Sequence, residues 1–110
     1  MRRKDVLRGD RSFDAVYKSG KSRGEKYVVL FWLDNGLGYN RTAFIASKKV
    51  GNSVKRHRAT RLLKESFRKL DELKEGYDMI FIARNSINGR KCREVYGSMK
   101  KLIGKAGLYR

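Results

Sequence analysis

The segment KKVGNSVKRHRATRLLKESFR, residues 48–68, decides the fold that the sequence predicts. Its apolar residues recur at the spacing of an amphipathic helix, so one side of this helix must pack on a sheet. Asn52 or Ser53 is the expected N-cap, and the helix is expected to continue to about Leu70. The helix also carries seven cations and a single acid, Glu65. Such an excess is unfavourable in isolation, because cations near a helix start oppose its dipole and repel one another.

The segments around this helix read as strands. Residues 26–33 and 77–83 are rich in β-branched and aromatic side chains, and residues 41–47 form a further candidate. The Gly-rich turn at 34–38 joins the first and second candidates along the chain, which predicts an antiparallel hairpin between them. A short extra strand is expected near residues 21–24.

Two more helices complete the predicted fold. Residues 10–18 have an apolar i, i+3, i+4 pattern, and residues 91–106 have a continuous apolar stripe. The order α-β-β-(β)-α-β-α predicts an α+β, single-domain two-layer sandwich over residues 1–110. Residues 1–9 are basic and lack a pattern, so we expect a flexible basic arm there.

The charge balance restricts the possible partners. The chain has 28 Lys and Arg against 11 Asp and Glu, a formal charge of +17 and an isoelectric point near 10.4. These values are typical of nucleic-acid-binding domains. No segment approaches the ~20 apolar residues of a membrane span, so no membrane partner is expected. Because Cys92 is the only cysteine and the first residues lack the apolar region of a secretory signal, we expect a reducing, cytoplasmic location.

One side of the 48–68 helix is the candidate nucleic-acid surface. His57, Arg61, Lys64 and Arg68 share an arc opposite the apolar side. A solvated surface is the competing interpretation, but solvated helices usually mix charges, and here Glu65 alone can pair weakly with its helical neighbours. A polyphosphate partner makes each cation favourable through counterion release, and the helix N-terminus itself attracts phosphate.

This segment resembles the signature helix of the bacterial ribonuclease P protein subunit, usually patterned Gly-Asn-x-Val-x-Arg-Asn-Arg-x-Lys-Arg. His57 stands where the family has Asn, and Thr60 stands where it has Lys. The resemblance extends over nearly the whole chain and includes three further features: the Phe13-x-x-x-Tyr17 pair, the aromatic strand around Phe31 and the I-A-R triplet at 82–84.

The resemblance implies a ribonucleoprotein in which a large catalytic RNA, with its own Mg²⁺ ions, removes the 5′ leader from precursor tRNA. The resemblance implies that the protein subunit binds both the catalytic RNA and the leader, and that it binds no cofactor itself. Its implied partners are this RNA and precursor tRNA, with no obligate protein partner. The resemblance also implies a left-handed β-α-β crossover around the signature helix, against the strong right-handed default.

Two groups of site residues follow. The residues expected to bind the catalytic RNA come from the signature helix and its adjoining cations: Lys55, Arg56, His57, Arg58, Arg61, Lys64 and Arg68. The residues that the resemblance places along a leader-binding cleft are Phe13, Tyr17, Phe31, Lys49 and Ala83. Aromatic rings suit a single strand, because stacking contributes about 1–3 kcal/mol per base without requiring a sequence. Core packing is the alternative for the rings on residues 10–18.

No residue is expected to be catalytic, and no metal site is expected on the protein. A protein nuclease needs convergent carboxylates or an acid and base pair, whereas the acids here are scattered or cluster on a connector at 71–75. Cys92 lies on an apolar stripe and is expected in the core. The alternatives left open are a structural RNA-binding protein, such as a ribosomal component, and a protein-only nuclease.

Overall fold

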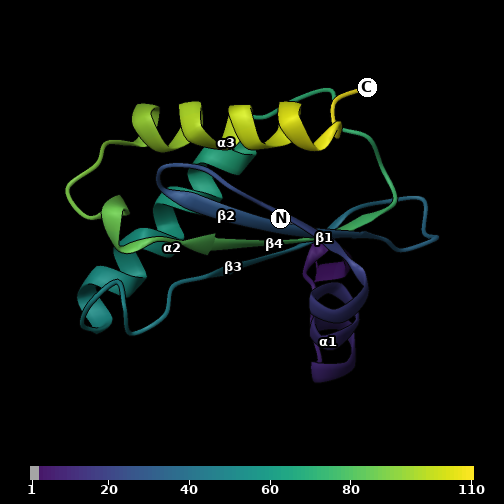
Figure 1. Cartoon of the computed structure of the whole chain (residues 1–110), viewed down its shortest axis with the longest axis horizontal. Coiled ribbons are helices and arrows are strands. Elements are labelled where there is room, and N and C mark those ends of the chain that lie inside the picture. Colours follow the sequence, from purple (N-terminus) through teal and green to yellow (C-terminus); the bar gives the residue numbers. More distant parts are fainter. Residues whose placement is uncertain (1–2) are drawn as a thin grey trace.

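A computed structural model describes residues 3–110 and contains one four-stranded sheet with helices on both faces (Figure 1). The α+β class and the order of elements are as predicted. In chain order the elements are η1 (Arg3–Asp5), α1 (Asp10–Ser19), β1 (Lys21–Gly24), β2 (Val28–Asp34), β3 (Arg41–Ile45), α2 (Ser53–Arg68), β4 (Tyr77–Ala83), η2 (Asn85–Ile87) and α3 (Cys92–Ala106).

The strands lie in the order β1-β2-β4-β3, so the predicted hairpin between β2 and β3 is wrong. β4 lies between them, antiparallel to β2 and parallel to β3. The turn after β2 explains the difference, because its amide side chains bond to the start of β4. Asn35 Nδ2 donates to Asp78 Oδ1 at 2.9 Å, and Asn40 Oδ1 accepts from the Tyr77 amide at 2.9 Å. The loop thus passes around the end of β4 and places β3 on its far side.

The parallel strands β3 and β4 are joined through α2, which makes a β-α-β crossover. This unit fixes α2 on the same face of the sheet as α3, and Figure 1 shows α1 on the opposite side of the sheet from α3. The family resemblance implies that this crossover is left-handed, and its handedness stays a prediction.

Each face of the sheet has its own apolar core. The main core packs β2 and β4 against α2 and α3, with Leu30, Leu63, Phe81 and Met99 fully buried. The second core is smaller and lies under α1, where Val16 packs with sheet residues. The expected two-layer sandwich therefore describes the sheet with α2 and α3, and α1 adds a partial third layer.

The N-terminal residues differ from the expected flexible arm. Leu7 is buried in the second core, and its amide donates to the Thr42 carbonyl at 2.9 Å, beside a parallel bridge between Val6 and Thr42. Leu7 thus provides an apolar anchor within an otherwise basic segment, and the flexibility of the arm stays a prediction. Residues 1–2 of the predicted arm lie outside the described residues.

Local sequence also fixes the start of α2. Asn52 is the N-cap, since its Oδ1 accepts from the Lys55 amide at 3.0 Å. The preceding Gly51 has φ +143°, a conformation that other residues rarely adopt, and a Cβ there would lie 2.6 Å from Lys55 Cδ. α2 ends at Arg68, two residues before the predicted end, and Leu70 bonds back to the Phe67 carbonyl in a tighter turn.

Candidate nucleic-acid interface

α2 presents an exposed side that we call the outer face of α2. Its members are exposed and lie opposite the buried Ala59, Leu63 and Ser66. They are Val54, His57, Arg58, Arg61, Lys64, Glu65 and Arg68. Among the side chains that the structure describes, ion pairs join Arg41 to Asp78, Lys105 to Glu25 and Arg110 to Glu75, and none of these involves α2. The acids of the described residues therefore form no ion pair with the cations of the outer face of α2.

Two predicted residues depart from this face. Arg56 is half-buried on the side of α2, and its enclosed Nε finds no hydrogen-bond partner among the described residues. Lys55 is exposed, but its aliphatic stem lies against Gly51 at the start of the helix. Arg58 stays on the outer face, where its Nη2 donates to the Arg90 carbonyl at 2.7 Å. This bond fixes the Arg58 side chain and leaves other guanidinium donors open to a ligand.

Val54 is a surface residue that the sequence-based site prediction missed. Its residue surface is 75% exposed, far more than the 41% of Tyr17 and 38% of Leu37. It lies three residues before His57 and seven before Arg61, so the helical spacing alone could have placed it on the cationic side. Because its side chain is exposed, Val54 contributes little to the stability of the fold. It adds an apolar side chain to the outer face of α2.

Three of the predicted leader-binding residues meet on the opposite face of the sheet. The ring of Tyr17 packs edge-on against Phe31, with centroids 5.0 Å apart and planes at 82°, and Phe13 lies 6.4 Å from Tyr17. Phe13 and Phe31 are half-buried in the second core, so core packing accounts for part of their role. Burial raises the pKa of the Tyr17 hydroxyl from its ordinary value.

The other two predicted cleft residues, Ala83 and Lys49, are not part of this aromatic contact. Ala83 is 4% exposed, pairs with Val28 and packs in the main core, so its side chain cannot line a cleft on the α1 face. The sequence could not reveal this, because the alternation along β4 does not tell which face α1 covers. Lys49 is exposed in the turn that follows β3. Half-buried Ile45 and Ile82 lie on the α1 face at that end of the sheet.

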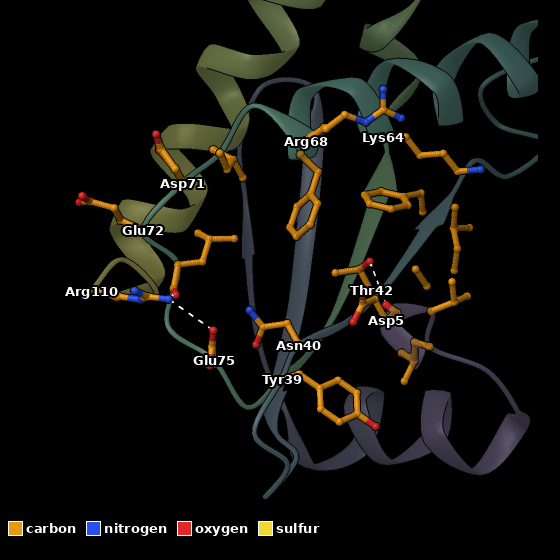
Figure 2. A pocket seen from close by; sticks show the side chains of 18 of the residues that line it. Asp5, Tyr39, Asn40, Thr42, Lys64, Arg68, Asp71, Glu72, Glu75 and Arg110 are labelled. Atoms are coloured by element: carbon orange, nitrogen blue, oxygen red, sulfur yellow. Dashed lines mark hydrogen bonds and ion pairs between the residues drawn. The ribbon is translucent and has the colours of Figure 1, made fainter. Parts of the chain in front are cut away.

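A groove of ≈ 890 Å³ follows the outer edge of β3, and Figure 2 shows its two unlike ends. Lys64 and Arg68 extend from α2 at one end. The other end carries exposed acids from the 71–75 connector, where Glu75 pairs with Arg110 at 3.3 Å. Phe13 also lines the groove, so the groove adjoins the aromatic cluster on the α1 face, which consists of Phe13, Tyr17 and Phe31. The acidic end is unfavourable for a phosphate backbone, so only the α2 end of this groove suits one.

The acidic side chains do not converge on one point as the carboxylates of a nuclease site would, as far as the described residues show. Asp78 is buried and receives two hydrogen bonds from Arg41, at 2.8 and 2.7 Å. Across residues 3–110, no three His, Cys, Asp or Glu side chains gather as metal ligands. Cys92 is half-buried rather than fully in the core, with its Sγ 3.8 Å from Ser66 Oγ. None of the described helices is long and apolar enough to cross a membrane.

The fold and the cationic helix define a small basic RNA-binding protein of the α+β class. The family model described as Ribonuclease P matches residues 1–107. The chain therefore belongs to the ribonuclease P protein family, whose members act in tRNA processing as part of a ribonucleoprotein. This membership excludes the ribosomal component that the composition alone allowed.

Individual relatives agree with this family. A ribonuclease P protein component of Thermoanaerobacter sp. (strain X514) is 47% identical, over 99% of this chain and 96% of that protein. Another, from Clostridium botulinum (strain Langeland / NCTC 10281 / Type F), is 43% identical over 97% and 98%. The RNase P protein of Thermotoga maritima has a TM-score of 0.81 at 26% identity, over 91% and 96% of the two chains. That of Staphylococcus aureus, at 23% identity, shares the fold with a TM-score of 0.85 over 96% and 98%.

Proposed function

We propose that this protein binds the catalytic RNA of ribonuclease P through the outer face of α2, and the 5′ leader of precursor tRNA through the aromatic cluster on the α1 face. The RNA subunit, with its Mg²⁺ ions, performs the cleavage, and the protein contributes no catalytic group and holds no cofactor. Neutralised phosphates let RNA and substrate approach each other at physiological ionic strength.

The observation that carries the proposal is the set of unneutralised cations on one side of a rigid helix. Arg61, Lys64 and Arg68 are exposed at a spacing of three and four residues, and the ion pairs of the described residues all lie elsewhere. Like charges at this spacing reduce helix stability unless a ligand supplies the opposite charge. A folded RNA backbone supplies it, and phosphate contacts fix orientation without reading sequence.

The leader assignment rests on the exposed ring of Tyr17. Phe31 supports this ring edge-on, which leaves a face of Tyr17 for stacking. Bases of a single strand stack on such rings whatever their sequence. Lys49 is exposed in the turn that follows β3, whose last residue Ile45 packs on the α1 face, and it would contact the leader backbone.

The assignment of chemistry to the RNA subunit is supported by how the protein uses its acids. Asp78, Glu25 and Glu75 are each held by a cation of the same chain. A two-metal nuclease site instead needs carboxylates that converge on one point.

The single free thiol of Cys92 supports a reducing, cytoplasmic location.

The test is a binding and cleavage assay with a bacterial ribonuclease P RNA at low Mg²⁺. The protein should raise the affinity for precursor tRNA more than that for mature tRNA, and it should restore cleavage that the RNA alone performs poorly. Protein incubated with precursor tRNA and Mg²⁺, without the RNA subunit, should leave the substrate intact. Equal effects on precursor and mature tRNA would remove the leader assignment, and cleavage by protein alone would move the chemistry to the protein.

A further inference from the structure

Glu65 is the only acid on α2, and it lies on the outer face among cations. Its neighbours one turn away, Arg61 and Lys69, could pair with it, but neither pair forms within residues 3–110. The carboxylate is therefore exposed and free within a surface that we propose binds RNA. Against a phosphate backbone alone, this charge would weaken binding.

Glu65 also lines a shallow hollow of ≈ 230 Å³ on the outer side of α2. The other lining residues are Arg58, Arg61 and Leu62. Half-buried Leu62 contributes an apolar side chain to the lining, and Arg58 and Arg61 contribute the cationic ones. The bond from Arg58 to the Arg90 carbonyl holds one wall in place before any ligand arrives.

The chemistry of the hollow favours a nucleobase. A carboxylate only accepts hydrogen bonds at neutral pH, so its partner must be a donor. In RNA the donors are the N–H groups of base edges and the 2′-hydroxyl. The apolar side chain of Leu62 and the planes of Arg58 and Arg61 suit the flat face of an unstacked base, whereas a ribose needs no such surface. The same arginines can neutralise the flanking phosphates.

We propose that this hollow binds one unstacked base of the catalytic RNA, with the Glu65 carboxylate accepting from N–H donors on the base edge. Guanine, whose Watson–Crick edge offers adjacent N1–H and N2–H donors, matches the two carboxylate oxygens. The inference rests on the proposed function, because it requires that the outer face of α2 contacts RNA. It adds a base-specific contact to a surface otherwise suited to phosphates.

The test compares Glu65→Ala and Glu65→Gln with wild type in binding to a ribonuclease P RNA. Glu65→Ala should lower the affinity roughly tenfold, within the range of one bidentate base contact. Glu65→Gln should fall between the two, because its amide keeps one acceptor. Asp71→Ala is the matched control, since it removes the same charge from an exposed site that does not line the hollow. It should leave the affinity unchanged or slightly higher.

A second arm identifies the donor. Inosine replaces guanine without its N2 amine, so inosine at one RNA position should weaken wild-type binding but not Glu65→Ala binding. If Glu65→Ala strengthens binding, the carboxylate only repels phosphate and the inference fails while the proposed function stands. If a 2′-deoxy substitution, and no inosine, loses its effect in Glu65→Ala, the ligand is the ribose and the base assignment fails. If wild-type protein does not bind RNA at all, the proposed function fails.

Discussion

Tyr17 and Phe31, from α1 and β2, meet edge-on with ring centroids 5.0 Å apart. The contact places an exposed ring over a half-buried one on the α1 face of the sheet. Phe31 thus supports the ring that we assign to the leader.

The aromatic pair gives the first prediction. Tyr17→Ala should reduce the preference for precursor over mature tRNA by about 1–3 kcal/mol, because one stacked base is lost. Tyr17→Phe keeps the ring and should retain most of the preference. Affinities of both substrates for the assembled ribonucleoprotein provide the measurement. An unchanged ratio in Tyr17→Ala would remove the ring from the leader site.

Val54 gives a prediction that separates apolar from ionic contact. Val54→Ser should leave the free energy of unfolding within about 0.5 kcal/mol, as for other surface substitutions, because the side chain is exposed. It should lower RNA affinity while the dependence of log K on log salt keeps its slope, since no phosphate contact is lost. Leu37→Ser, on an exposed turn, is the control for general effects. A changed slope in Val54→Ser would contradict an apolar contact.

The N-terminal anchor can be tested by stability. Leu7→Ala should reduce the free energy of unfolding by about 2 kcal/mol or more, because Leu7 is 3% exposed in the second core. Urea unfolding of the full chain measures this, with exposed Arg8→Ala as a neighbouring control. If both variants unfold like wild type, the segment behaves as the flexible arm that the sequence suggested.

Glu25 predicts how stability depends on pH. The hydrogen bond from Lys105, at 3.0 Å, lowers the pKa of the Glu25 carboxyl from its ordinary value of 4.5. The folded state thus binds this proton less readily than the unfolded state, so the stabilisation is complete above pH 4.5 and is lost as the pH falls through the folded-state pKa. Urea unfolding between pH 6 and 3 should show a smaller loss for Glu25→Gln than for wild type. Parallel curves would contradict the pairing.

The sequence predicted the elements better than their arrangement. The helical spacing of the 48–68 segment and its Asn52 cap are local properties, so α2 and the exposure of Arg61 and Lys64 could be predicted directly. The strand order could not, because side-chain amides of the 35–40 loop bond to β4, a segment more than thirty-five residues away. A turn rich in Asn and Gly between two strands predicts a hairpin, and the sequence does not show that its side chains bond to β4 instead.

The site was predicted in the same uneven way. Phe13, Tyr17 and Phe31 share one face as expected, but Ala83 points into the main core. A β-strand alternates between faces, so a single residue of difference in register reverses the side on which a residue lies. Only the packing of α1 on one face and α3 on the other settles which side is which.

The central claim is that the cations of the outer face of α2 bind the RNA backbone. The most direct measurement is the affinity for a ribonuclease P RNA over a range of salt concentrations, for wild type and for a variant with Arg58, Arg61, Lys64 and Arg68 all changed to Gln. The slope of log K against log salt should become shallower by roughly three in the variant, because about four phosphate contacts are lost. An unchanged slope, with the variant folded, would contradict the claim.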